Sequence, residues 1–88
     1  MSQQSLIARI VDFYPDEVFI KPEGFDEAVI GVEGETLVLV YSVKKCLQIL
    51  VDSGMDYMDA VNFFEYHVRN QDFGTRTPLF IEDHFDVI

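Results

Sequence analysis

The side chains that could act as nucleophiles stand apart from any general base. Cys46 is the only cysteine and falls on the apolar stripe of an expected helix, where a free thiol usually fills the core. Ser42 precedes that helix without the Gly-x-Ser-x-Gly surroundings of an activated serine, so we expect it to cap the helix. The sequence contains neither a phosphate-binding Gly-rich loop nor a dinucleotide fingerprint. We therefore expect no enzymatic activity and no cofactor.

Metal-ligating residue types gather at the C-terminal end of the sequence. Three carboxylates and one imidazole lie close together there: Glu82, Asp83, His84 and Asp86. Divalent cations bind such groups, but the composition of residues 82–88 is more typical of a solvated acidic tail that frays. His67 follows Phe64 on an expected helix and is predicted to lie at the edge of the core. We expect no metal site.

The charge of the chain favours a basic partner. Sixteen acidic residues stand against six basic ones, which gives a formal net charge of −10. Contacts with nucleic acid or with an anionic membrane need clustered Lys and Arg, and only Lys44 and Lys45 are adjacent. Direct binding to nucleic acid or to a membrane is therefore not expected. A protein with a basic surface is the partner that this charge favours.

Acidic residues concentrate between residues 16 and 35. The expected partner-binding residues are six carboxylates and one aromatic anchor: Asp16, Glu23, Phe25, Asp26, Glu27, Glu33 and Glu35. If residues 16–27 fold back along the hairpin that follows, these side chains form an acidic patch with an exposed aromatic residue. The alternative is a solvated face that only keeps the protein in solution.

A second hypothesis belongs to another functional class. The loop over residues 70–77 and the hairpin are expected to frame a pocket for a nucleotide-type signalling molecule. The ligand-binding residues of that pocket would be Arg69, Asn70, Arg76 and Thr77. In this alternative the protein sequesters a small molecule.

Length and composition indicate one globular domain over residues 1–88. Of the 88 residues 49% are hydrophobic, which is enough to fill one core but not two. The sequence shows no cleavable leader pattern, no apolar run of about 18 residues and no second cysteine for a disulfide. These features favour a cytoplasmic protein.

A β-hairpin is the clearest element that the sequence predicts. Two runs rich in β-branched residues, 28–32 and 36–41, flank Gly34, which can adopt the positive φ of a tight turn. Residues 38–40 are consecutively apolar, as in a strand that is buried on both faces. Either the first helix, opposite the later two, or a second copy of the protein is expected to cover the second face. A homodimer is therefore one of the expected states.

One helix is expected before this hairpin in the sequence and two after it. Apolar spacing favours a helix over residues 3–13, with a strand as the competing assignment. Ser42 is expected to cap a second helix that ends at Gly54, and Asp56 a third. The buried face of the third helix is predicted to consist of Tyr57, Val61, Phe64 and Val68.

A last strand completes the predicted fold. It covers residues 79–81 and begins after Pro78, which suits a strand at the edge of a sheet. The order is helix, strand, strand, helix, helix, strand. We therefore expect an α+β fold, in which a small antiparallel sheet with a central hairpin packs against helices.

Four stretches carry a resemblance that covers roughly residues 15–82: FDEAVIG, YSVKKCLQIL, DAVNFFEYHV and TPLFIED. They are similar to a group of small, acidic proteins encoded by phages and prophages. The positions that match the pattern of this group are Phe25, Asp26, Ala28, Gly31, Tyr41, Ser42, Cys46, Phe64, Glu65, Gly74, Thr77 and Pro78. The group often has Asn where this chain has His67, so a role tied to that Asn does not transfer.

The resemblance implies a function rather than a catalytic mechanism, because none of these motifs is catalytic. It implies a non-enzymatic phage or prophage accessory protein that binds and modulates a bacterial protein in the cytoplasm of the host cell. A counter-defence inhibitor that presents its acidic surface to a basic host protein is the role that we expect.

Overall fold

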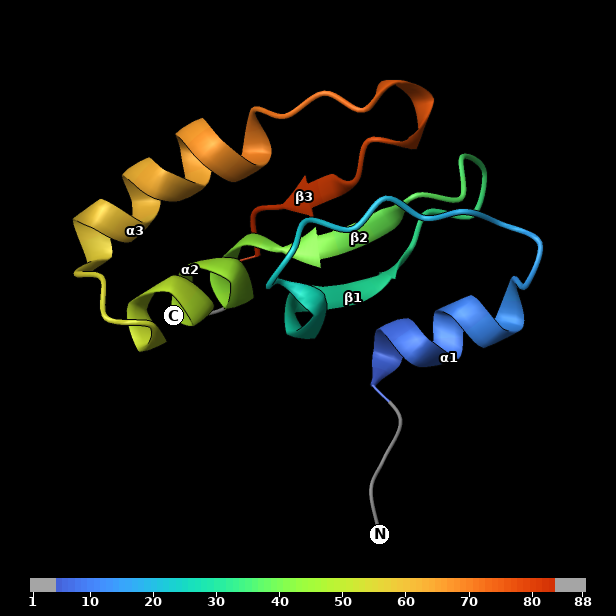
Figure 1. The fold of residues 1–88 in the computed structure, drawn as a ribbon, viewed down its shortest axis with the longest axis horizontal. Coiled ribbons are helices and arrows are strands. Elements are labelled where there is room, and N and C mark those ends of the chain that lie inside the picture. The colour runs from blue at the N-terminus through green and yellow to red at the C-terminus, as the bar shows by residue number, and fades with distance from the viewer. Residues whose placement is uncertain (1–4, 84–88) are drawn as a thin grey trace, which may run out of the picture.

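The computed structural model describes residues 5–83, which form three α-helices and a three-stranded sheet (Figure 1). The helices are α1 (Leu6–Phe13), α2 (Val43–Asp52) and α3 (Tyr57–Phe64), and the strands are β1 (Val29–Val32), β2 (Leu39–Ser42) and β3 (Leu79–Ile81). The short 3₁₀ turns η1 (Asp26–Ala28) and η3 (Gly74–Arg76) and the π-helical turn η2 (Glu65–Arg69) complete the elements. The predicted α+β order is confirmed.

Helix α1 forms within the range that the sequence predicted, and the competing strand assignment is wrong. The Ser5 side chain accepts a hydrogen bond from the Ala8 N–H, which caps the helix. Ile7 and Ile10 are buried along one side. The helix ends before Pro15, whose ring disfavours helical backbone at the preceding residue. Residues 3 and 4 of the prediction lie outside the described residues.

The sheet is mixed, whereas an antiparallel one was expected from the sequence. Its strand order is β1-β2-β3, with β1 antiparallel and β3 parallel to β2. A parallel neighbour requires a crossover connection, and α2 and α3 provide it by carrying the chain back to the end where β2 begins. The predicted edge position of β3 is confirmed.

The hairpin turn depends on Glu33 rather than on Gly34. The residue with positive φ is Leu37, at 55°, and Gly34 does not adopt that conformation. The Glu33 carboxylate accepts hydrogen bonds from the backbone N–H and the hydroxyl group of Thr36, and these bonds lower the pKa of Glu33. The loop is therefore longer than predicted, and β2 begins at Leu39 rather than at residue 36.

A single hydrophobic cluster joins all three helices to one face of the sheet. Its members include Ile7, Ile10, Leu39, Tyr41, Cys46, Leu47, Leu50, Ala60, Phe64 and Val68. Helix α1 therefore lies on the same side as α2 and α3, and the prediction that it covers the opposite face is wrong. Val38 and Val40, whose side chains alternate with those of Leu39 and Tyr41, are also buried. The prediction that this strand is buried on both faces is confirmed.

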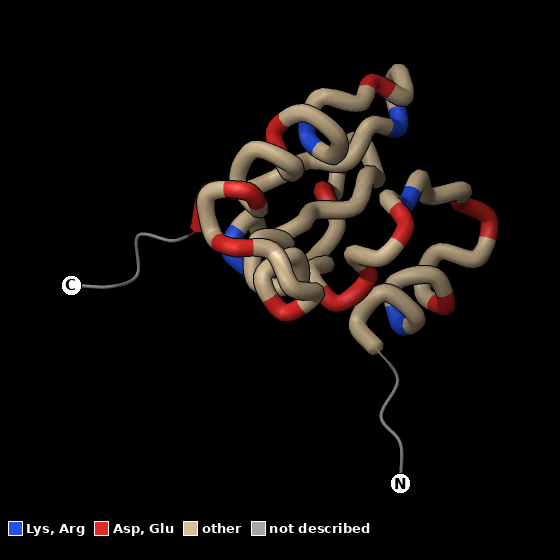
Figure 2. Tube along the Cα trace, turned by 60° about the vertical axis from the view of Figure 1, so that its left-hand side comes forward, with Lys and Arg blue, Asp and Glu red and all other residues tan. Residues whose placement is uncertain are grey.

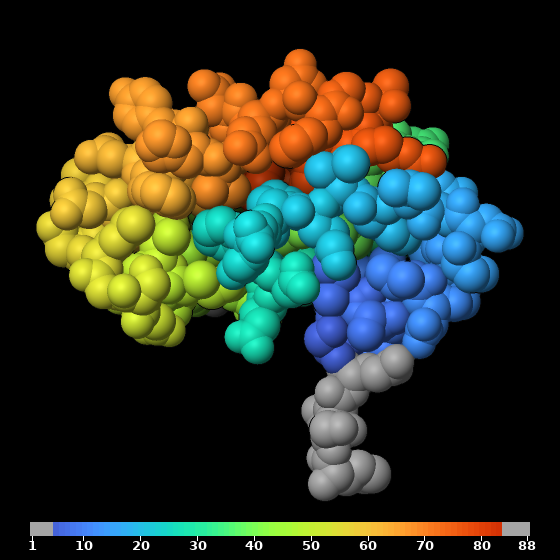
Figure 3. Space-filling model, in the orientation of Figure 1, coloured from blue at the N-terminus to red at the C-terminus, as the bar shows by residue number. Residues whose placement is uncertain are grey.

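The segment between α1 and β1 crosses the sheet. In Figure 3 its atoms fill the space between α1 and α2 and hide most of the strands. Tyr14 and Phe19 pack against the core cluster, and Phe25 is a member of it. This segment thus contributes one buried and two partly buried aromatic rings as well as exposed acids.

Strand β2 continues directly into α2, and Asp83, two residues after β3, holds this junction. The Ser42 hydroxyl accepts a hydrogen bond from the Lys45 N–H, as predicted for a cap, and donates one to the Asp83 carboxylate. Asp83 also accepts a hydrogen bond from the Lys44 N–H. The predicted fraying of the tail does not include Asp83, and residues 84–88 lie outside the described residues.

Replacing Asp83 by Ala should lower the free energy of unfolding by about 1–2 kcal/mol, because the N-terminus of α2 loses a capping carboxylate. Burial opposes ionisation of Asp83, but the hydrogen bonds from Ser42 and Lys44 outweigh it and lower the pKa of its carboxyl group. Stability from a lowered carboxyl pKa is present above the unfolded-state value and disappears as the pH falls through the folded-state value. The gap between wild type and D83A should therefore narrow below about pH 4.

Urea denaturation from neutral to acidic pH measures this gap. Glu35→Ala serves as the control, since Glu35 is exposed in the hairpin loop. Equal destabilisation by D83A and E35A at neutral pH would contradict the assigned role of Asp83.

Replacing Tyr41 by Phe should leave stability unchanged or raise it by up to about 1 kcal/mol. The Tyr41 hydroxyl group is buried and has no hydrogen bond to any described residue, and burial together with the charge of Asp26 raises its pKa. Phe keeps the ring, whose centroid lies 5.5 Å from that of Phe80. Thermal unfolding compares Y41F with Tyr66→Phe at an exposed position, and a loss above about 1 kcal/mol in Y41F alone would show that the hydroxyl group has a partner.

Candidate functional site

The acids that were predicted to form one patch lie in two groups. Arg76 pairs with the Glu17 carboxylate at 2.8 Å and donates a hydrogen bond to the Leu37 carbonyl at 3.3 Å. It thereby brings the start of the acidic segment to the hairpin loop. Asp26 and Glu27 lie elsewhere, on η1, which contacts α2. In Figure 2 acidic positions recur along most of the outline rather than on one side.

Most of the predicted carboxylates are nevertheless exposed. Those without a hydrogen bond or ion pair to another described residue are Asp16, Glu23, Asp26, Glu27 and Glu35. Glu33 differs, because its carboxylate is used within the hairpin turn. The predicted acids thus supply charge at the surface, but from two separate places.

The predicted aromatic anchor, Phe25, is wrong. Its side chain is only 6% exposed and packs in the core cluster with Ala28 and Val29. Acidic residues on both sides in the sequence suggested an exposed position. The η1 turn instead directs the acids outward and the ring inward, because burial of an aromatic ring contributes more to stability than its exposure.

Three of the four residues of the predicted small-molecule site are engaged in interactions within the protein. Arg69 pairs with Glu65 at 3.6 Å and with Glu82, and its guanidinium lies 5.2 Å from the centre of the Phe64 ring. Arg76 is occupied by the Glu17 carboxylate. The remaining two residues are placed differently, since the Thr77 hydroxyl bonds within its own loop and Asn70 is exposed. A phosphate would have to displace carboxylates from both arginines.

The candidate nucleophiles and metal ligands behave as structural groups. Burial, together with the charge of Asp83 and against that of Arg69, raises the pKa of the Cys46 thiol to about 12, so the thiol stays protonated and unreactive. No group of three or more His, Cys, Asp or Glu within residues 5–83 is placed to hold a metal ion. His84 and Asp86 lie outside that range. His67 is exposed, with its ring 4.8 Å from that of Phe63, and not at the core edge.

Helix α3 and the η2 turn that follows it expose large side chains that were not expected from the sequence. Tyr57 was predicted to be buried, but it is 58% exposed, and Met58 and Tyr66 are 62% and 72% exposed. Tyr57 is the first residue of α3 and projects past the helix end toward α2. The predicted burial of Phe64 and Val68 is confirmed. A large apolar residue at the first position of a helix was the feature that could have revealed this exposure.

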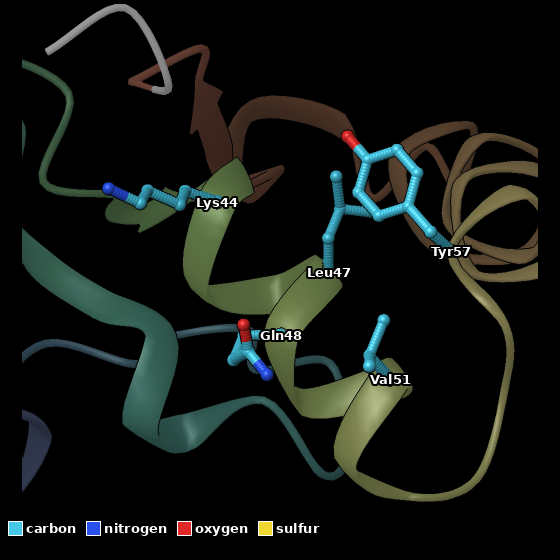
Figure 4. A pocket seen from close by; sticks show the side chains of 5 residues that line it. All are labelled: Lys44, Leu47, Gln48, Val51 and Tyr57. Atoms are coloured by element: carbon cyan, nitrogen blue, oxygen red, sulfur yellow. The ribbon is translucent and has the colours of Figure 1, made fainter. Parts of the chain in front are cut away.

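A small pocket lies between α2 and the start of α3 (Figure 4). It is lined by Lys44, Leu47, Gln48, Val51 and Tyr57 and has a volume of about 100 Å³. Leu47 and Tyr57 face each other across it, while the Lys44 side chain extends away from Tyr57 (Figure 4). Sites for small ligands usually have volumes of about 300–1,000 Å³, so this pocket suits one side chain of a partner rather than a nucleotide.

A broader hollow lies along α1. Its volume is about 290 Å³, and it is lined by Leu6, Arg9, Ile10, Phe13, Tyr14 and Val32. Phe13 is exposed at its rim. The hollow is a shallow depression in the surface, without the enclosed walls of a small-molecule site.

Comparisons with known proteins return no relative: no protein-family model, curated protein or solved structure matches this chain. The structure itself shows that no helix of residues 5–83 has the length and apolar character needed to cross a membrane.

Cys46 should resist thiol reagents as long as the protein is folded, because the thiol is buried and its raised pKa disfavours the thiolate. Reaction with Ellman's reagent at pH 8 should be slow in buffer and complete rapidly in denaturant. Thr75→Cys, which places a second thiol at an exposed position, serves as the control. Equally fast reaction of native Cys46 and of Cys at position 75 would contradict the burial of Cys46.

Proposed function

We propose that this chain is a non-enzymatic accessory protein of a phage or prophage, which binds and modulates a bacterial protein with a basic surface in the host cytoplasm. The resemblance of residues 15–82 to small acidic phage proteins supports this origin, and a counter-defence inhibitor remains the proposed role.

The observation that carries the proposal is the uncompensated charge at the surface. Five predicted carboxylates are exposed without a partner among the described residues, while Arg69 and Arg76, two of the six basic residues, are neutralised by ion pairs. A net charge of −10 attracts a basic protein over distance even when the acids lie in two groups. The acids therefore contribute mainly to the association rate and to the choice of partner.

Sequestration of a small molecule is less well supported. Its two arginines are paired with carboxylates, and the α2–α3 pocket is smaller than usual ligand sites. A thermal-shift screen against nucleotides tests this alternative, because a ligand of the folded state must raise the melting temperature.

Reversing two charges on η1 should weaken the complex. A partner copurified from bacterial lysate at low salt should be released at high salt, and Asp26→Lys with Glu27→Lys should lower its affinity at least about tenfold and flatten the salt dependence. Asp16→Lys with Glu35→Lys makes the same charge change on the other acidic group. A larger loss in the first variant identifies η1 as a contact, whereas equal losses indicate general attraction. Unchanged affinity in both variants would contradict the proposed function.

A further inference from the structure

We propose that the α2–α3 pocket is the docking site for a basic segment of the partner protein, with one aliphatic side chain of that segment inserted between Leu47 and Tyr57. This inference rests on the proposed function and adds the docking surface and the chemistry of the segment that it binds. The acids that were predicted from the sequence then steer the partner, and the pocket holds it.

The shape and lining of the pocket define the anchor. Leu47 and Val51 come from α2 and Tyr57 from α3, and they form apolar walls (Figure 4). Gln48 and Lys44 complete the lining, with Lys44 at the start of α2. A volume of about 100 Å³ accommodates one aliphatic side chain. Met58, the next residue of α3, is also exposed. Buried anchors in such pockets supply most of the binding energy of protein interfaces.

The charges around the pocket define what flanks the anchor. Asp52, Asp56 and Asp59 are all exposed and surround the turn between α2 and α3. Asp52 accepts a hydrogen bond from the Gln48 side chain at 2.8 Å, which holds this carboxylate next to the pocket lining. The chain has no Lys or Arg between residues 46 and 68. Lys or Arg residues beside the anchor are therefore the complementary groups.

The charges also give the docked segment a direction. Lys44 and Lys45 lie at the N-terminal end of α2, and the three aspartates lie at its C-terminal end. The basic end of the partner segment should therefore lie over the α2–α3 turn, and its neutral or acidic end over the start of α2.

A second copy of this chain is the poorer occupant. It would bring another net charge of −10 to the surface, and its own basic residues are few and partly engaged in ion pairs. Repulsion between the two copies would oppose docking.

Peptide selection tests the proposal with the full chain. Peptides are selected from a displayed library of random sequences of about 16 residues, long enough to cover a helix of this size, and are then titrated by fluorescence anisotropy at low and high salt. The selected sequences should share one aliphatic residue followed or preceded, always on the same side, by two or more Lys or Arg.

Two variants and one matched control locate the binding site. Val51→Phe fills the pocket and should weaken binding at least about tenfold. The triple variant D52N/D56N/D59N removes three charges while Asn keeps a helix cap at position 56, and it should weaken binding and flatten its salt dependence. The triple variant D16N/E23Q/E35Q makes the same charge change elsewhere and should stay within about threefold of wild type. If V51F does not fold, Tyr57→Ala at the exposed rim replaces it.

Several results would overturn the proposal: no selected peptide, selected peptides without cations, V51F or its replacement binding like wild type, or equal losses in both triple variants. A dimer in sedimentation that V51F dissociates would also overturn it, in favour of self-association. The proposed function fails separately, if no basic bacterial protein is retained by the wild-type chain. A retained partner that is lost in D26K/E27K but not in V51F would leave that function intact and place the docking surface on η1.

Discussion

The burial of β2 and its direct continuation into α2 constrain the rest of the structure. Both edges of β2 are paired, with β1 on one side and β3 on the other, and Ser42 is at once its last residue and the cap of α2. Because no loop separates the strand from the helix, the direction of α2 is fixed by the strand. Cys46 and Leu50 are thereby held toward the core, Gln48 and Val51 toward the pocket, and Leu47 contributes to both.

Local features of the fold could be predicted from the sequence, and long-range ones could not. The caps at Ser42 and Asp56 depend on one side chain and the helix that follows it, and both were predicted correctly. The pairing of β3 depends instead on how two helices pack before the chain returns. The parallel direction of β3 was missed because residues 79–81 could pair with β2 in either direction, so their sequence does not indicate which one is adopted. The turn at Glu33 was missed because a carboxylate that binds its own loop has no distinctive spacing.

In the candidate site, the surface charge could be predicted from the sequence, but the exposure of individual aromatic rings could not. The sequence shows how many acids there are, and they are mostly exposed, since ionised side chains are costly to bury. It does not show which aromatic rings are buried. Phe25 and Tyr57 each have acidic neighbours, yet the first lies in the core and the second on the surface, because one precedes a turn into the sheet and the other begins a helix. Only the packing of α2 against α3 creates the pocket.

The parallel pairing of β3 also has a kinetic consequence. Residues 40 and 79 lie side by side in the sheet but far apart along the chain, and closing so long a loop is entropically slow. The hairpin and the α2–α3 pair involve near neighbours in the chain and can form early, before the third strand arrives. We therefore expect the edge of β2 that receives β3 to be the last part of the sheet to close during folding and the first to open.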